Sequence, residues 1–100
     1  MAPAFNRRRP LPDGVPELIR DTVLACTAAT PRILDLGAGS GRIAAPFLSA
    51  NDNYIAADLS AGMLHAFRDK HPRARILQSD ATALPFPDGA FDAIILVQVL

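Results

Sequence analysis

The sequence has one cysteine, no net charge and no long apolar run, and each of these absences narrows what the protein can be. Cys26 is the only cysteine among the 100 residues, so the chain has no partner for an internal disulfide and no cysteine metal cluster. A single cysteine suits a reducing compartment, and we predict a cytoplasmic protein. Ten basic and ten acidic residues give a net charge of zero. Composition therefore offers no argument for nucleic acid or an anionic membrane surface as a partner.

No stretch of the chain has the pattern of a membrane span or a targeting signal. The longest aliphatic run, Ala93 to Leu100, is interrupted by Gln98 and is far shorter than the ~20 residues that cross a bilayer as a helix. The arginines at 7 to 9 could begin a signal peptide, but prolines at 10, 12 and 16 follow where an apolar segment is required. We therefore predict a soluble protein without a membrane span.

The first 30 residues contain a tail and a helix. Residues 1–14 are rich in arginine and proline and show no periodicity, which predicts a flexible tail. Apolar residues then recur at helical spacing and predict a helix from about Pro16 to Ala29. We expect Cys26 to pack on the apolar face of this helix, because cysteine is often buried.

Strands and helices alternate over the rest of the chain. Short apolar runs predict strands at 32–36, 54–58, 73–78 and 93–100, with helical segments at 43–50 and 61–70. Pro46 fits the first turn of its helix only if that helix begins late, near Ala44 or Ala45. This order indicates an α/β fold with a Rossmann-like, doubly wound parallel sheet. Sheets of this kind bind ligands at the carboxyl ends of their strands.

Three glycines follow the first strand in the pattern D-x-G-x-G-x-G, from Asp35 through Gly37 and Gly39 to Gly41. Glycine allows the positive φ angles of a tight turn and lets a ligand approach the backbone without meeting a Cβ. A dinucleotide fingerprint, G-x-G-x-x-G, would place its third glycine at position 42, which is Arg42. The pattern thus indicates a cofactor-sized polar ligand other than a nicotinamide dinucleotide. The alternative is a glycine-rich turn in some other kind of α/β protein.

Acidic residues follow the next two predicted strands. Asp58 stands where a carboxylate can accept hydrogen bonds from both hydroxyls of a ribose; alternatively it is only a strand-end residue beside the helix cap Ser60. Asp80 can accept from an amino group of adenine, while the N–H of Ala81 donates to a ring nitrogen. The alternative for Asp80 is a cap on a short turn.

Taken together, these segments resemble the class I S-adenosylmethionine methyltransferases, in particular the branch of ubiquinone/menaquinone-biosynthesis methyltransferases. The resemblance lies in ILDLGAGSGR, DLSAGML and SDATALPFPDGAFDAIILVQVL, and it covers residues 31–100. It implies S-adenosylmethionine as the cofactor, with no metal and with no catalytic residue assigned. Met63 is equally well explained as helix core. The cofactor-binding residues that the resemblance implies are Asp35, Gly37, Gly39, Gly41, Asp58, Leu59, Met63, Asp80 and Ala81.

The resemblance implies methyl transfer to a small-molecule acceptor that the sequence does not identify. Members of the family continue after the fourth strand, so we expect residues 15–100 to be the N-terminal, cofactor-binding part of such a domain. In that case the fourth strand has an exposed edge that could pair with another chain. One alternative function is a truncated, non-catalytic cofactor-binding remnant or half of an assembly. A nucleotide-dependent oxidoreductase is the third, and Arg42 disfavours it.

Overall fold

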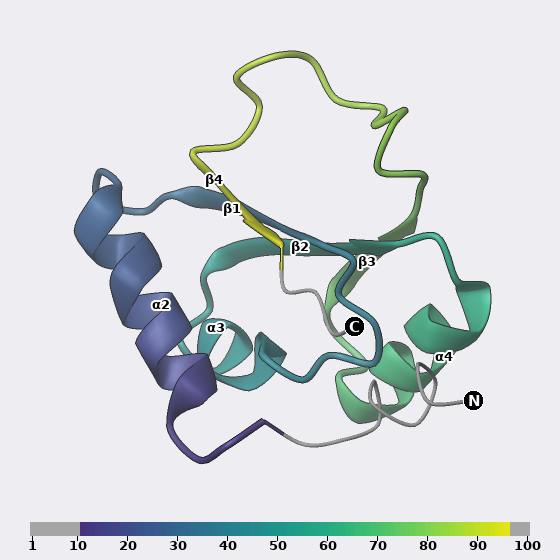
Figure 1. Cartoon of the computed structure of the whole chain (residues 1–100), viewed down its shortest axis with the longest axis horizontal. Helices are drawn as coiled ribbons and strands as arrows, with labels where there is room; N and C mark the ends of the chain where they lie inside the picture. The colour runs from purple at the N-terminus through teal and green to yellow at the C-terminus, as the bar shows by residue number, and fades with distance from the viewer. Residues whose placement is uncertain (1–10, 97–100) are drawn as a thin grey trace.

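The computed structural model describes residues 11–96 of the chain (Figure 1). Most of the predicted tail and the end of the fourth predicted strand, residues 1–10 and 97–100, lie outside the described residues. The elements in chain order are α2 (Val15–Cys26), β1 (Arg32–Leu36), α3 (Ala44–Ser49), β2 (Asn53–Asp58), α4 (Ala61–Lys70), β3 (Arg75–Gln78) and β4 (Ala93–Leu96).

The four strands form one parallel sheet in the order β3-β2-β1-β4. The chain winds outward from β1 through β2 to β3 and then returns to the other side of β1 for β4, which confirms the predicted doubly wound order. In the register, Asp35 of β1 lies opposite Ala56 of β2 and Ile95 of β4. The winding direction changes between β1 and β4, and open α/β sheets bind ligands at the carboxyl ends of strands near such a point.

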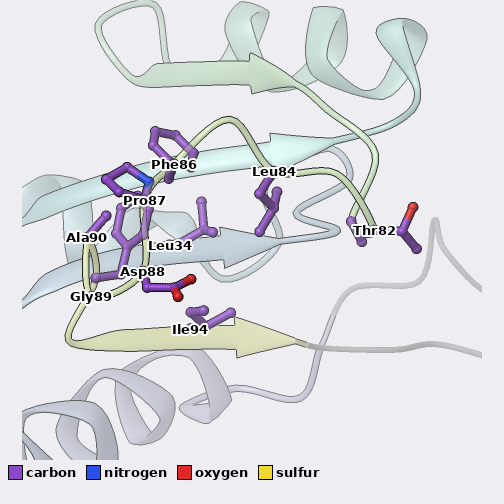
Figure 2. Close-up of a pocket in the computed structure, with 11 residues that line it drawn as sticks. Leu34, Thr82, Leu84, Phe86, Pro87, Asp88, Gly89, Ala90 and Ile94 are labelled. Atoms are coloured by element: carbon purple, nitrogen blue, oxygen red, sulfur yellow. The ribbon is translucent and has the colours of Figure 1, made fainter.

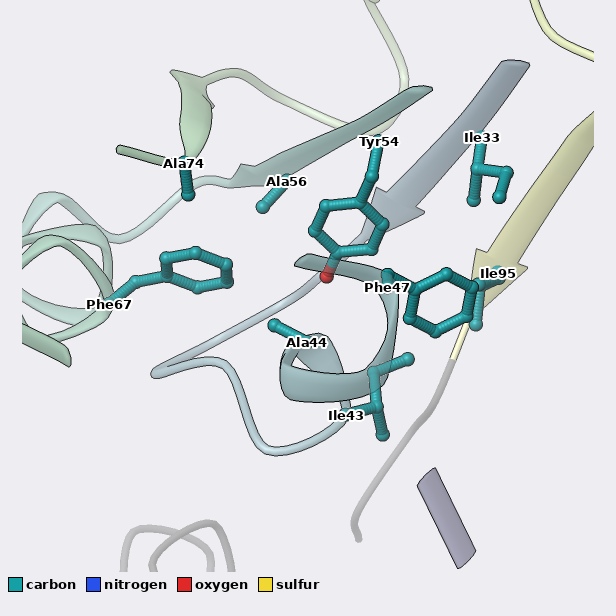
Figure 3. Close-up of a cluster of buried hydrophobic side chains, with 9 residues drawn as sticks. All are labelled: Ile33, Ile43, Ala44, Phe47, Tyr54, Ala56, Phe67, Ala74 and Ile95. Atoms are coloured by element: carbon teal, nitrogen blue, oxygen red, sulfur yellow. The ribbon is translucent and has the colours of Figure 1, made fainter. Parts of the chain in front are cut away.

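All three described helices lie on one face of the sheet, where the main core forms (Figure 1). The ring of Phe47 from α3 stacks on Tyr54 from β2 at a centroid distance of 5.0 Å, and Phe67 enters the same core from α4 (Figure 3). Helix α2 adds the partly buried Ile19 and Val23. The buried members of this core are Ile33, Ile43, Ala44, Phe47, Tyr54, Ala56, Phe67, Ala74 and Ile95.

The loop between β3 and β4 lies over part of the opposite face of the sheet (Figure 2). Leu34 of β1 is fully buried on this face, whereas Ile94 and Leu96 of the edge strand β4 are 57% and 56% exposed. Within residues 11–96 no helix lies over these strands, and the loop passes above them in Figure 1. Pairing of another chain with the β4 edge stays a prediction.

Most element boundaries agree with the sequence analysis, and the placement of Cys26 does not. Helix α3 begins at Ala44, so Pro46 lies in the first turn, where a missing N–H costs no helical hydrogen bond. The prediction that Cys26 is packed is wrong: α2 ends at this residue and its thiol is exposed. The helix contacts the core through Ile19 and Val23 instead, two turns and one turn earlier. None of the helices within residues 11–96 is long and apolar enough to span a bilayer.

Candidate functional site

Hydrogen bonds join the carboxyl ends of β1, β2 and β3 into one continuous edge. The backbone N–H groups of Gly37 and Ala38 both donate to the carbonyl oxygen of Ala57, at 2.8 and 3.0 Å. On the other side, the N–H of Ser79 donates to the carbonyl oxygen of Asp58 at 3.0 Å. The glycine turn, Asp58 and the segment around Asp80, which are far apart in the sequence, therefore lie at one edge of the sheet, as predicted.

The three glycines of the turn all have positive φ angles but face different surroundings. Gly37, Gly39 and Gly41 have φ values of 76°, 60° and 91°, in a region that side chains with a Cβ rarely adopt. A Cβ on Gly39 would meet no atom within 4 Å, so open space lies over this glycine. A Cβ on Gly41 would lie 2.9 Å from the ring of Phe67 and 3.3 Å from that of His71. Gly39 thus leaves room for a ligand, and Gly41 leaves room for helix α4.

The carboxylate of Asp58 lies directly beside the open glycine. Its Oδ2 accepts a hydrogen bond from the N–H of Gly39 at 2.8 Å, and its Oδ1 accepts one from the N–H of Ser60 at 2.9 Å. The hydroxyl of Ser60 in turn accepts from the N–H of Met63 at 3.2 Å and caps α4. Strand β2 and the cap of α4 therefore hold the Asp58 side chain over the glycine turn.

Two apolar residues of the predicted site follow Asp58 in the sequence. Leu59 is 66% exposed, which is unusual for a large aliphatic side chain. Its backbone is held by the side-chain amide of Gln78, which donates to the Leu59 carbonyl oxygen at 3.1 Å. Met63, in the first turn of α4, is half-buried, so it belongs partly to the helix packing and partly to the surface of the site.

Asp80 and Ala81 are exposed at the tip that follows β3. Oδ1 of Asp80 accepts hydrogen bonds from both the N–H and the hydroxyl of Thr82, at 2.9 and 2.8 Å. These bonds favour the charged carboxylate and lower the pKa of Asp80. Asp80 therefore does cap a turn, which was the structural alternative. Because the carboxylate remains at the surface, this role is compatible with ligand binding.

Asp35 differs from the other acids of the site because it is almost completely buried, with 1% of its surface exposed. The hydroxyl of Tyr54 donates a hydrogen bond to its Oδ2. Burial raises the pKa of Asp35 to about 6; the Tyr54 hydrogen bond acts in the opposite direction, and the charge of Asp58 adds to the rise. Burial and the adjacent carboxylate also raise the pKa of Tyr54. At neutral pH the chain thus holds an anion below the glycine turn.

Sequence reasoning missed Tyr54, which it treated only as part of a buried strand. The pattern shows which residues alternate along one strand, but it does not show how two strands are aligned. The alignment places Tyr54 opposite Ile33, so Tyr54 and Asp35 are diagonal neighbours on the same face of the sheet. The sequence signal that could have indicated this pair was a tyrosine in the strand predicted to follow the one that contains Asp35.

A pocket of about 320 Å³ lies elsewhere, between the sheet and the loop that lies over part of its second face (Figure 2). Leu34 and Ile94 form its floor, and Leu84, Phe86 and Phe91 of the loop also line it. Of the predicted cofactor-binding residues only Ala81 contributes to it. Within residues 11–96 no group of three or more histidine, cysteine or acidic side chains is placed to hold a metal ion.

Comparison with known proteins agrees with this geometry. A family model described as a methyltransferase domain matches residues 33–100. The demethylmenaquinone methyltransferase of Renibacterium salmoninarum is 38% identical over 79 residues, 77% of this chain and 33% of that protein. The ubiquinone/menaquinone biosynthesis C-methyltransferase of Vibrio cholerae is 35% identical over 94 residues, 83% of this chain and 36% of that protein. This chain thus spans about a third of the length of these relatives.

The fold also matches solved structures. The glycopeptide N-methyltransferase MtfA, crystallised with (S)-adenosyl-L-homocysteine, superposes with a TM-score of 0.66 at 28% sequence identity. The match covers 90% of this chain and 40% of that one. The fold described above is therefore similar to that of a solved methyltransferase.

Proposed function

The chain belongs to the methyltransferase domain family. We propose that the protein binds S-adenosylmethionine at the strand tips and transfers the methyl group of this cofactor to a small molecule. The observation that carries this proposal is the contact between Asp58 and Gly39. It places a carboxylate, which accepts hydrogen bonds, beside a backbone that a ligand can approach closely.

The residues at the strand tips fit the chemical parts of this cofactor. The open space over Gly39 admits the chain that joins its sulfur to its amino acid part. Asp35 supports the cationic amino group, and Asp58 accepts hydrogen bonds from the ribose hydroxyls. The exposed side chain of Leu59 offers an apolar surface to the adenine, and Asp80 with the N–H of Ala81 contacts the adenine edge.

Methyl transfer of this kind depends mainly on alignment. The bound cofactor supplies a reactive methyl group on a sulfonium centre. The contribution of this chain is to hold the cofactor in one orientation through Gly37, Gly39 and Asp58 and to exclude water from the reacting region. Good orientation of the reacting groups can account for ~7–11 kcal/mol of a reaction barrier.

Demethylmenaquinone is the first acceptor to test, because the names of the two relatives given above refer to demethylmenaquinone and to ubiquinone/menaquinone biosynthesis. The loop over residues 83–91 and the helix α2 around Leu18 are the parts of this chain that we expect to contribute to acceptor binding. Leu18 is 64% exposed, and the loop lines the pocket in Figure 2.

Calorimetric titration with S-adenosylhomocysteine tests the cofactor site. We expect saturable binding that weakens by about 10- to 100-fold in Asp58→Asn, since hydrogen bonds to a charged group are worth ~1.5–3 kcal/mol. Asp21→Asn is the matched control, because Asp21 is an exposed acid on α2, and it should bind like the wild type. NADH should not compete. A folded wild-type protein that binds NADH but not S-adenosylhomocysteine would contradict the proposal.

Transfer itself is measured separately, as incorporation of a labelled methyl group into demethylmenaquinone. The enzymatic function is supported if the wild type forms methylated product and Asp58→Asn forms less of it. Cofactor binding without transfer to any acceptor of a broad panel would favour the non-catalytic alternative.

A further inference from the structure

Tyr54 and Asp35 form a polar pair inside an otherwise apolar core. Each of the two side chains is 1% exposed, and the Tyr54 hydroxyl donates to Oδ2 of Asp35. Among residues 11–96, Asp35 is the only acidic or basic residue that is fully buried. A carboxylate in such a position is costly unless it is hydrogen-bonded, so its single tyrosine donor has a large influence on its state.

Packing holds the tyrosine in a fixed position. Its ring stacks on Phe47 of α3 at 5.0 Å and an interplanar angle of 23° (Figure 3). The register of β1 and β2 directs the hydroxyl diagonally across the sheet to Asp35. The hydrogen bond thus joins the core beneath α3 to Asp35, which lies two positions before the first glycine of the turn.

Few ionisable groups besides Tyr54 act on Asp35. Asp58 on β2 repels its charge, and Arg42 lies in the turn between β1 and α3. Helix α3 and the described part of β4 contain no ionisable residue. Helix α4 packs through Leu64 and Phe67. The ionisable residues of α4, all of them exposed, are His65, Arg68, Asp69 and Lys70.

We propose that Tyr54 is a positioning residue that holds the Asp35 carboxylate oriented and charged for the amino group of the bound cofactor. This inference rests on the proposed function. Without the hydroxyl, the buried carboxylate loses a donor that favours its ionised form, and its pKa rises above about 6. A larger fraction of Asp35 is then protonated at neutral pH, and the cationic amino group of the ligand loses an anionic partner.

Two ligands separate this effect from a general loss of packing. S-adenosylhomocysteine carries the amino group, whereas 5′-methylthioadenosine has the same adenosine part and lacks the amino acid part. Tyr54→Phe removes the hydroxyl and keeps the ring that stacks on Phe47. At pH 7 we expect it to bind S-adenosylhomocysteine about tenfold more weakly and 5′-methylthioadenosine as tightly as the wild type does.

The dependence of binding on pH gives a second readout. In the wild type, the affinity for S-adenosylhomocysteine should fall as the pH drops through about 6. In Tyr54→Phe the midpoint of this fall should move to higher pH, while binding of 5′-methylthioadenosine stays independent of Asp35. In an Asp35→Asn background, the additional Tyr54→Phe change should have no further effect on either ligand.

A fluorinated protein keeps both the ring and the hydroxyl of Tyr54. Tyr54 is the only tyrosine of this sequence, so incorporation of 3-fluorotyrosine alters this one position. Fluorination makes the hydroxyl a stronger hydrogen-bond donor, and the midpoint should move to lower pH, opposite to the effect of Tyr54→Phe. This protein keeps the test decisive if Tyr54→Phe does not fold.

The outcomes distinguish a failure of the proposed function from a failure of the role of Tyr54. A folded wild-type protein that binds neither ligand contradicts the proposed function and this inference with it. A wild type that binds S-adenosylhomocysteine, with a pH midpoint that neither fluorination nor Tyr54→Phe moves, contradicts only the role of Tyr54. If Tyr54→Phe lowers the affinity for both ligands equally, Tyr54 has only a packing role, which also contradicts the inference.

Discussion

Gly39 and Gly41 are both glycines of the same turn, but their surroundings differ. Gly39 faces open space and its N–H donates to Asp58, and we propose that it forms part of the ligand-binding surface. Gly41 lies against Phe67 and His71, so it belongs to the contact between the turn and α4. The resemblance assigned Gly41 to the cofactor with the other two, and the structure offers this packing role in addition.

Alanine should therefore mainly reduce stability at Gly41 and mainly reduce ligand binding at Gly39. Gly41→Ala combines a positive φ with a Cβ placed 2.9 Å from Phe67, and we expect it to lower the free energy of unfolding by about 2–5 kcal/mol. Gly39→Ala is the matched control: it has only the cost of a positive φ, about 1–2 kcal/mol, but its methyl group should block the ligand. Urea unfolding and calorimetric titration with S-adenosylhomocysteine measure the two effects. Equal destabilisation by both changes would contradict the packing role of Gly41.

At the scale of elements, the helices are attached to the sheet by different means. Helix α3 has only six residues, too few to be stable alone, and packing of Phe47 and Ala44 in the core holds it in place. Helix α2 has no fully buried residue. It is joined to the turn before β2 by Arg20, whose guanidinium makes two hydrogen bonds to the carboxylate of Asp52, at 2.7 and 3.0 Å.

Removal of that ion pair should loosen α2 and leave the sheet intact. We expect Asp52→Asn to lower the hydrogen-exchange protection of the α2 amides by about two- to tenfold, because the pair is one of few attachments of this helix. The amides of β1 and β2 should keep their protection. Asp92→Asn is the control, because it breaks the comparable pair with Arg32 and does not touch α2. Unchanged exchange of α2 in Asp52→Asn would show that its apolar contacts are sufficient.

For the molecule as a whole, the buried Asp35 makes stability depend on pH. Its pKa is about 6 in the folded protein against 3.8 for an ordinary aspartate, so the folded state binds this proton more tightly than the unfolded state does. The contribution therefore favours folding below about pH 4 and is lost as the pH rises to about 6. At ~1.4 kcal/mol per pKa unit, the change amounts to about 3 kcal/mol.

Comparison with Asp35→Asn isolates this contribution. The difference in unfolding free energy between variant and wild type should change by about 3 kcal/mol in favour of the variant between pH 3 and pH 7. Asp80 and Asp92, whose pKa values are lowered, act in the opposite direction but are common to both proteins and cancel. Chemical denaturation at a series of pH values measures the difference. A constant difference across this range would mean that Asp35 is not held in the buried state described here.

Much of this architecture could be predicted from the sequence because it depends on neighbours along the chain. Apolar periodicity placed the strands, Pro46 required the late start of α3, and Ser60 predicted the start of α4. Because parallel strands end at the same edge of a sheet, the sequence predicted that Asp58 and Asp80 lie at the same edge as the glycine turn. The placement of Cys26 was wrong because burial at a helix end depends on what the helix packs against.

By itself, then, the sequence determined the parallel α/β fold and the glycines and acids of the candidate site. The three-dimensional packing was needed to show which glycine faces open space, which one accommodates α4, and that Tyr54 donates to Asp35. The physical reason is that these contacts join residues 19 or more positions apart. They depend on strand register and helix packing, which the pattern along a single strand or helix does not contain.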